Sequence, residues 1–211
     1  MANSNNPFGL MYLGLYGGGV NNSAMQERRN GILYSNGTAI YRQDLMMQSA
    51  NGYLYQWANA TAVSQLWGVM GGCRYYSNSQ QTITPNKYWP GTDAAAGTVL
   101  AQYIPGIMSG TPVFAIQTGA TGITVADIGI NADIVVGTGS TLTGTSGAYL
   151  DDANLTTTST VPLRIVDLYA NWATGNQAEE AGQGSGLIPG TQAGAYNWAV
   201  VALNITQSTG V

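Results

Sequence analysis

The sequence predicts an all-β fold, a barrel or a jelly-roll-like sandwich with long loops and an extended N-terminal arm. Glycine and proline, with 29 and 7 residues, recur at short intervals, so few stretches can hold a long helix without a breaker. Short apolar runs rich in Val, Ile, Tyr and Thr lie between these breakers, as is typical of all-β chains. Near the N-terminus, Pro7 and the Gly17-Gly18-Gly19 run work against regular structure.

The arm is predicted to span residues 1–31, and the β domain residues 32–211. The arm holds too few apolar side chains to form a core of its own, so we expect them to be buried against a neighbouring subunit. These interface candidates are Phe8, Leu10, Tyr12, Leu13 and Leu15. Arg28 and Arg29 close the arm, either as a solvated turn or as an anchor that forms ion pairs with an acidic partner.

The β domain is expected to begin with a strand region over residues 32–41, which turns at Asn36-Gly37. The next segment carries the clearest hairpin pattern, because apolar runs flank Asn51-Gly52, a pair that favours a two-residue type I′ turn. A helix over residues 53–67 is the alternative for the second half of this segment. In that helix Leu54, Trp57, Ala58 and Thr61 would share one face.

Two further strands and a loop are predicted before the middle of the chain. The apolar run that ends at Gly71-Gly72 is expected to be one strand, and residues 73–76 the next. Residues 77–97 are expected to form a polar loop that displays Tyr88 and Trp89. Since Trp and Tyr dominate the energetics of many interfaces, Trp89 is predicted to be an interface anchor.

The second half of the chain supplies the remaining strands and loops. Strands are predicted over residues 98–104, 112–118, 162–169 and 196–205, with a weaker strand pattern over residues 123–130. The last strand is apolar enough to be central and buried on both faces. Residues 137–147 are expected to form a loop or a flat strand, and residues 173–195 a long loop that is functional or faces a partner.

The charge of the chain excludes several classes of function. Only 8% of the residues are charged, and the net charge is −4. Six scattered cations cannot neutralise many phosphates, so we predict no binding to nucleic acid. The apolar runs are too short to cross a membrane, and the opening residues lack the basic and apolar regions of a secretory signal. So few charges leave broad uncharged faces, which favours self-association.

Catalytic and metal-binding patterns are scarce. Without histidine and with a single cysteine, the chain cannot form a serine-histidine-aspartate triad, an internal disulfide or an ordinary zinc site. The pairs Asp151-Asp152 and Glu179-Glu180 are not expected to converge, because neighbours on an extended chain point to opposite faces. Asp127 and Asp133 lack the spacing of a calcium loop. We therefore predict no enzymatic activity, no cofactor and no metal, and little change in stability between about pH 5 and 8.

Several short motifs occur in an order that resembles one family of virion proteins. They are Met-Ala-Asn followed by Asn6-Pro7-Phe8-Gly9-Leu10, Tyr41–Leu45, Trp67–Tyr75, Tyr88-Trp89-Pro90, Asp127–Gly129, Gly137–Leu150, Leu163–Leu168 and a Val-rich closing strand. The family is that of the head decoration, or cement, proteins of podovirus-like tailed phages. Its pattern has a glycine where this chain has Gln43.

The resemblance implies a structural protein of the virion that has no catalytic residues. It implies binding to the major capsid protein at subunit junctions on the outer capsid surface, after synthesis in the host cytoplasm. A homotrimer is favoured over a homodimer, because a three-fold junction presents three equivalent edges. The alternative is a tail or head-fibre adhesin that binds host glycans through its aromatic side chains. A hydrolase that uses acidic residues is a third hypothesis.

Overall fold

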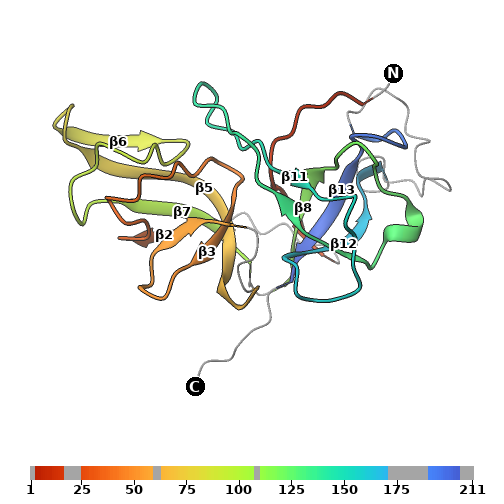
Figure 1. Ribbon diagram of the computed structural model, residues 1–211. Helices are drawn as coiled ribbons and strands as arrows, with labels where there is room; N and C mark the ends of the chain where they lie inside the picture. The colour runs from red at the N-terminus through yellow and green to blue at the C-terminus, as the bar shows by residue number, and fades with distance from the viewer. Residues whose placement is uncertain (1–2, 17–24, 59–62, 107–109, 171–189, 205–211) are drawn as a thin grey trace.

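The computed structural model describes residues 3–16, 25–58, 63–106, 110–170 and 190–204. Over these residues the fold is all-β, as predicted, with two antiparallel sheets in a sandwich-like arrangement (Figure 1). The barrel alternative is wrong, since neither sheet closes on itself. Most of the predicted loop over residues 173–195 lies outside the described residues.

The first sheet has five strands, in the order β1-β8-β13-β12-β9. They are β1 (Met11–Leu15), β8 (Pro112–Gln117), β13 (Trp198–Leu203), β12 (Leu163–Leu168) and β9 (Asn131–Ala132). The apolar strand β13 lies at the centre between two antiparallel neighbours, and every residue in it after Trp198 is buried. This confirms the prediction for the closing strand.

The second sheet has six strands. In order they are β2 (Gln26–Arg29), β7 (Leu100–Pro105), β5 (Leu66–Ser77), β3 (Leu45–Gln48) and β4 (Leu54–Gln56), and β6 (Thr82–Asn86) also pairs with β5. A separate ladder joins β10 (Ile134–Val135) to β11 (Tyr149–Leu150). Single 3-10 turns occur at η1 (Val63–Gln65) and η2 (Val125–Asp127).

The main hydrophobic core joins the two sheets. Leu45 and Leu66 of the six-stranded sheet belong to one buried cluster with Phe114, Leu163 and Val201 of the five-stranded sheet. A second cluster packs on the six-stranded sheet, and a third, smaller one involves β8 and β13. Burial of these side chains on the sheets is the main favourable contribution to the stability of the fold.

The N-terminal segment belongs to the fold over its described residues and is not an arm that leaves it. β1 pairs with β8 in the five-stranded sheet, and β2 pairs with β7 in the six-stranded sheet. Leu10, which precedes β1, is fully buried in the main core. The predicted boundary at residue 31 therefore does not divide an arm from the β domain.

The predicted hairpin is confirmed, but its turn differs. β3 and β4 pair antiparallel, so the helical alternative is wrong for this segment. The Ser49 N–H donates to the Tyr53 carbonyl at 2.9 Å, which leaves three residues in the loop. In the Asn51-Gly52 pair only Gly52 has a positive φ, +84°, whereas a type I′ turn requires it at both positions.

β5 runs through Gly71-Gly72 as one strand, where the sequence predicted two. Its pairing with β7 shifts register between Met70 and Gly72, so the glycines form a bulge and do not end the strand. A bulge bends a strand and increases its twist without breaking the sheet. Glycine, which often ends a strand, therefore lies within the continuous strand β5 here.

Three other segments correct the sequence prediction. β6 lies within the predicted polar loop over residues 77–97, because it pairs with the far end of β5. Residues 32–41 form only one isolated bridge and no strand. The weak strand pattern over residues 123–130 contains η2, where the Asp127 carboxylate accepts the Thr124 N–H at 2.7 Å and favours a turn.

Candidate functional site

The first predicted interface residues are used by the fold itself. Leu10 is fully buried in the main core, so the prediction that it is buried against a neighbouring subunit is wrong. Phe8 is half-buried and meets Trp198 edge-on, with ring centroids 4.6 Å apart. The contact with β13 provides within the same chain the burial that was expected from a partner.

Apart from the buried Gly14, the residues of β1 are half-buried in the same sheet. The Tyr12 ring meets Phe114 of β8 edge-on at 5.8 Å, and Leu13 packs against the third cluster. Leu15 is also half-buried. Local sequence could not reveal these contacts, because β8 follows β1 only after the whole six-stranded sheet.

The two arginines of β2 have different surroundings. The Arg28 guanidinium lies 4.9 Å from the centroid of the Trp67 ring and donates to the Gly52 carbonyl at 2.7 Å. Arg28 is thus neither a solvated turn residue nor an anchor to an acidic partner. Arg29 is exposed, and it lines a surface groove of about 610 Å³ together with Arg74.

Trp89 is buried, so the prediction that it is displayed as an interface anchor is wrong. Its exposed fraction is 0%, and its Nε1 donates to the Asn36 carbonyl at 2.9 Å. The ring meets Tyr75 edge-on at 5.5 Å. Tyr88 is half-buried and stacks on Tyr41, with centroids 5.1 Å apart and planes inclined by 12°.

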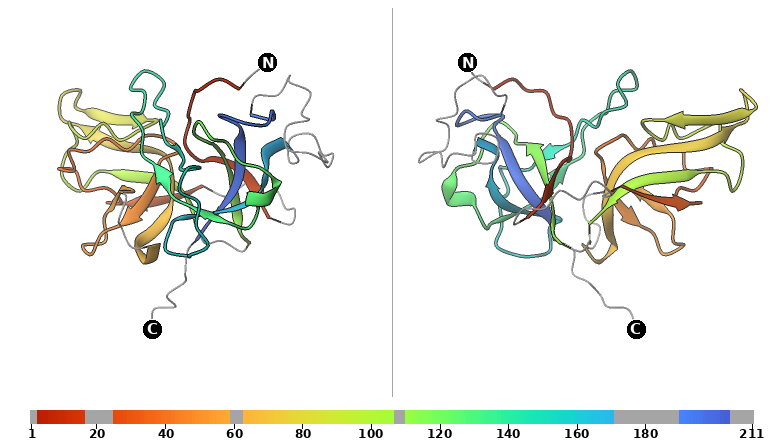
Figure 2. Two further views of the ribbon diagram at one scale, coloured as in Figure 1. Left: turned by 45° about the vertical axis from the view of Figure 1, so that its right-hand side comes forward. Right: turned by 180° about the vertical axis from the view of Figure 1, so that it is seen from behind.

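The loop over residues 137–147 joins β10 to β11 and projects beyond the two sheets (Figures 1 and 2). Two backbone hydrogen bonds join its two halves. The Ser140 N–H donates to the Thr145 carbonyl at 2.9 Å, and the Gly144 N–H donates to the Ser140 carbonyl at 2.8 Å. These bonds give the loop a defined shape.

The base of the 137–147 loop is held by a neighbouring segment. The Arg42 N–H donates to the Gly144 carbonyl and the Ser146 N–H donates to the Arg42 carbonyl, both at 2.9 Å. The Tyr41 ring lies against Gly139 so closely that any side chain there would collide with it. The loop is therefore fixed at its base as well as at its tip.

The tip of this loop presents an apolar side chain. Leu142 is 94% exposed. Arg42 and Lys87 are exposed at the base, where a side chain at Gly144 would contact Lys87. The sequence predicted a loop or flat strand here, and the segment is one of the motifs of the resemblance, but Leu142 was not singled out. The single leucine in a Gly/Thr/Ser run was the available signal.

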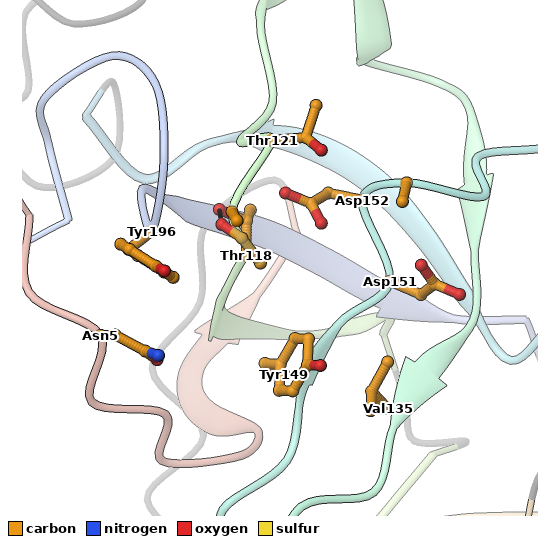
Figure 3. Close-up of a pocket in the computed structure, with 11 residues that line it drawn as sticks. Asn5, Thr118, Thr121, Val135, Tyr149, Asp151, Asp152 and Tyr196 are labelled. Atoms are coloured by element: carbon orange, nitrogen blue, oxygen red, sulfur yellow. Dashed lines mark hydrogen bonds between the residues drawn. The ribbon is translucent and has the colours of Figure 1, made fainter.

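A pocket of about 310 Å³ lies beside β11 (Figure 3). Four parts of the chain line it: the N-terminal segment, the turn after β8, the β10–β11 ladder with the residues that follow it, and the segment that leads into β13. Its polar and aromatic lining includes Asn5, Thr121, Tyr149, Asp151, Asp152 and Tyr196.

The acidic pair in this pocket diverges, as the sequence predicted. Both Asp151 oxygens accept from Nδ2 of Asn154, at 3.1 and 2.9 Å. The Asp152 carboxylate accepts the Gly122 N–H. Figure 3 shows the two carboxylates turned in different directions. The pair Glu179-Glu180 lies outside the described residues.

The floor of the pocket is a buried polar network. Thr118 Oγ1 donates to Oδ1 of Asn197 at 2.9 Å, and the same oxygen accepts the Ile123 N–H at 3.0 Å. Asn197 Nδ2 in turn donates to the Ile123 carbonyl at 2.7 Å. Because both the Oδ1 and the Nδ2 of Asn197 are hydrogen-bonded, the network holds the turn after β8.

Two buried titratable groups lie away from the pocket. Burial raises the pKa of the Asp44 carboxyl to about 6, although its hydrogen bonds lower it. Burial also raises the pKa of the Cys73 thiol to about 12, so this thiol stays protonated and donates to the Tyr88 carbonyl at 3.3 Å. A protonated, buried thiol is a poor nucleophile.

Metal-ligating side chains do not gather in groups of three or more within the part of the chain that the structure describes. The Asp127 carboxylate is bonded to Thr124, and the Asp133 carboxylate to the N–H of Ile134. In the same residues no helix has the length and apolar character needed to cross a membrane.

Comparison with family models, with curated proteins and with solved structures found no match to this chain.

Proposed function

We propose that the protein is a capsid decoration protein, which binds the major capsid protein at subunit junctions on the outer surface of a phage head. The observation that carries the proposal is the 137–147 loop, which presents Leu142 at 94% exposure on a backbone of fixed shape. A side chain held in this way gains burial on binding while little of the loop remains to be ordered.

The chemistry of the loop defines the surface that it fits. Leu142 would be buried in an apolar hollow of the partner. The exposed cations Arg42 and Lys87 at the base of the loop would pair with carboxylates around that hollow. Complementary charge at the edge of an interface contributes to orientation and to the association rate. The proposed partner surface is therefore an apolar hollow with an acidic rim.

The backbone at Gln43 supports the resemblance to the decoration proteins. The family pattern has glycine at this position, and Gln43 has a φ of +74°, in the left-handed region that favours glycine. Its N–H donates to the Met70 carbonyl at 2.7 Å, and its carbonyl accepts the Leu10 N–H at 2.9 Å. Contacts on both sides hold the residue in this conformation.

The expected assembly is a homotrimer in preference to a homodimer. This follows from the three-fold symmetry of the junctions that such proteins occupy and from a chain with only 8% charged residues. Light scattering of the purified protein measures the mass of the assembly. A monodisperse monomer would contradict this expectation.

Quantitative mass spectrometry of purified virions tests the proposed function. A decoration protein is expected in many copies, in a fixed ratio to the major capsid protein. A protein found in only a few copies per particle would instead be a fibre component, and one absent from the particle would overturn the proposal.

An adhesin that binds glycans remains the second candidate. The observation that favours it is the pocket beside β11, whose wall includes the half-buried tyrosines Tyr149 and Tyr196. Aromatic faces of this kind pack well against the apolar faces of ligands. A glycan array distinguishes this candidate from a protein that binds only the capsid.

A further inference from the structure

We infer that the pocket beside β11 binds one neutral sugar ring, with Asp152 accepting hydrogen bonds from its hydroxyls and with Tyr149 and Tyr196 as aromatic walls. This inference does not rest on capsid docking. It concerns a different surface from Leu142, and it rests on the second candidate of the proposed function, a protein that binds glycans.

The Asp152 carboxylate has an acceptor directed at the pocket. Asp152 is 7% exposed, and its Oδ2 accepts the Gly122 N–H. Its Oδ1 receives no hydrogen bond from the described residues, and it lies so close to Gly119 that a side chain there would collide with it. This oxygen keeps free acceptor capacity on the pocket side, so a hydroxyl of a ligand in the pocket can donate to it.

The charge of the pocket selects against anions. None of the described residues that line it is Lys or Arg, and Asp151 adds a second carboxylate. A phosphate or a carboxylate ligand would meet only like charge. The ligand is therefore neutral or cationic.

The rim favours a neutral polyhydroxylated ligand over an ammonium. The Asn5 amide and the Thr121 hydroxyl both donate and accept hydrogen bonds, and the Tyr149 hydroxyl adds a further polar group. An ammonium only donates, so it can pair with the carboxylates but cannot accept from the Asn5 amide, whereas a hydroxyl can do both. A sugar ring carries hydroxyls around its edge, each of which can donate and accept a hydrogen bond. Its apolar C–H faces can pack on Tyr149 and Tyr196.

The pocket is formed before any ligand binds. Tyr196 has a φ of +61°, which a bulky residue adopts only when its surroundings hold it there. Its N–H donates to the Gly119 carbonyl at 2.9 Å, and its carbonyl accepts from Gln117 Nε2 at 3.4 Å. Both hydrogen bonds come from β8 and the turn after it. They hold the backbone of Tyr196 against the five-stranded sheet and so fix where its side chain begins.

The volume restricts the size of the ligand. Small-molecule sites usually measure about 300–1,000 Å³, and this pocket, at about 310 Å³, lies at the lower end. It holds one ring, and any further sugar units would lie outside it.

An NMR titration of the full chain with methyl glycosides of glucose, galactose, mannose and N-acetylglucosamine tests the inference. We expect saturable shifts for at least one glycoside, confined to residues 118–122, 149–153 and 196, with a dissociation constant on the order of 1 mM. In Asp152→Asn the oxygen bonded to Gly122 is kept, while an amide replaces the free oxygen. Binding should weaken at least tenfold.

Two further variants separate binding from folding. Tyr196→Gly removes the aromatic wall and relieves the positive φ, so it should lose binding while its Tm stays at or above that of the wild type. Glu27→Gln removes one negative charge from an exposed side chain on the other sheet and should bind like the wild type. The inference is overturned if no glycoside gives a saturable shift, if Asp152→Asn or Tyr196→Gly binds normally, or if methylammonium binds the pocket more tightly than every glycoside.

Discussion

Asp44 is expected to make stability depend on pH although the chain has no histidine. The side chain is 1% exposed, and its Oδ2 accepts the Tyr41 N–H at 2.7 Å and Gln56 Nε2 at 2.8 Å. Burial outweighs these bonds and raises the pKa of the carboxyl to about 6. The expectation of a nearly flat stability profile above pH 5 considered histidine and did not include a buried acid, so the two expectations differ for this interval.

The free energy of unfolding should fall as pH rises through the interval between the two pKa values of Asp44. The carboxyl ionises near its ordinary pKa of 3.8 when the chain is unfolded, and near 6 when it is folded. Ionisation therefore favours the unfolded state over this interval, and the loss reaches on the order of 3 kcal/mol and stays constant above it. Urea unfolding at about pH 4.5 and about pH 7 should show about 2 kcal/mol of this loss, because the remaining third has already occurred at pH 4.5.

Asp44→Asn provides the matched comparison. Asparagine is neutral at every pH and keeps an acceptor for Tyr41 and Gln56, so the variant should lose this pH dependence and exceed the wild type in stability at neutral pH. Glu27→Gln, at an exposed site, should keep the wild-type profile. Identical profiles for Asp44→Asn and the wild type would show that burial does not control the titration of Asp44.

Gln43 gives a second test at the residue scale. Replacing it by glycine removes the penalty of a φ of +74° and should stabilise the protein by about 0.5–1 kcal/mol. The corresponding change at Gln48, the last residue of β3 and one without a positive φ, should destabilise it by a similar amount. Thermal unfolding of the two variants measures both effects, and a lower Tm for Gln43→Gly would contradict the account.

β1 is the element whose role differs most from the sequence prediction. Leu10 leads into it and is fully buried, so Leu10→Ala should cost about 2–5 kcal/mol of stability. Tyr16, just after β1, is 60% exposed, and Tyr16→Ala should change stability by no more than about 0.5 kcal/mol. Chemical denaturation measures both variants. Equal, small losses of stability in the two variants would contradict the assignment of this segment to the core of the fold.

The strands that the sequence predicted correctly are those with a strong local pattern. β7, β8, β12 and β13 are short apolar runs between breakers, and the β3–β4 hairpin has Gly52 at its turn. What the local pattern could not distinguish is the role of each glycine. Gly71-Gly72 reads as a strand end and is a bulge, because only the partner strand β7 decides between the two.

At the scale of the molecule, the sites depend on contacts between distant segments. The pocket combines Asn5, Tyr149 and Tyr196, and the buried position of Trp89 depends on the Asn36 carbonyl. Such contacts are set by the pairing of the sheets, which sequence periodicity does not specify. This is why the fold class could be predicted while Trp89 was misplaced and the pocket and Leu142 were missed.

Docking through the 137–147 loop is the central claim about the whole molecule. Cosedimentation of the purified protein with capsid shells that lack it tests this claim most directly, using the wild type, Leu142→Asp and Ile83→Asp. Ile83 is a second exposed apolar residue, at 67%, on β6 away from the loop. Loss of about 1.5–3 kcal/mol of burial corresponds to at least a tenfold loss of affinity. The account predicts saturable binding of the wild type and of Ile83→Asp, with Leu142→Asp weakened by that factor or more. Undiminished binding of Leu142→Asp, or no binding of the wild type, would contradict it.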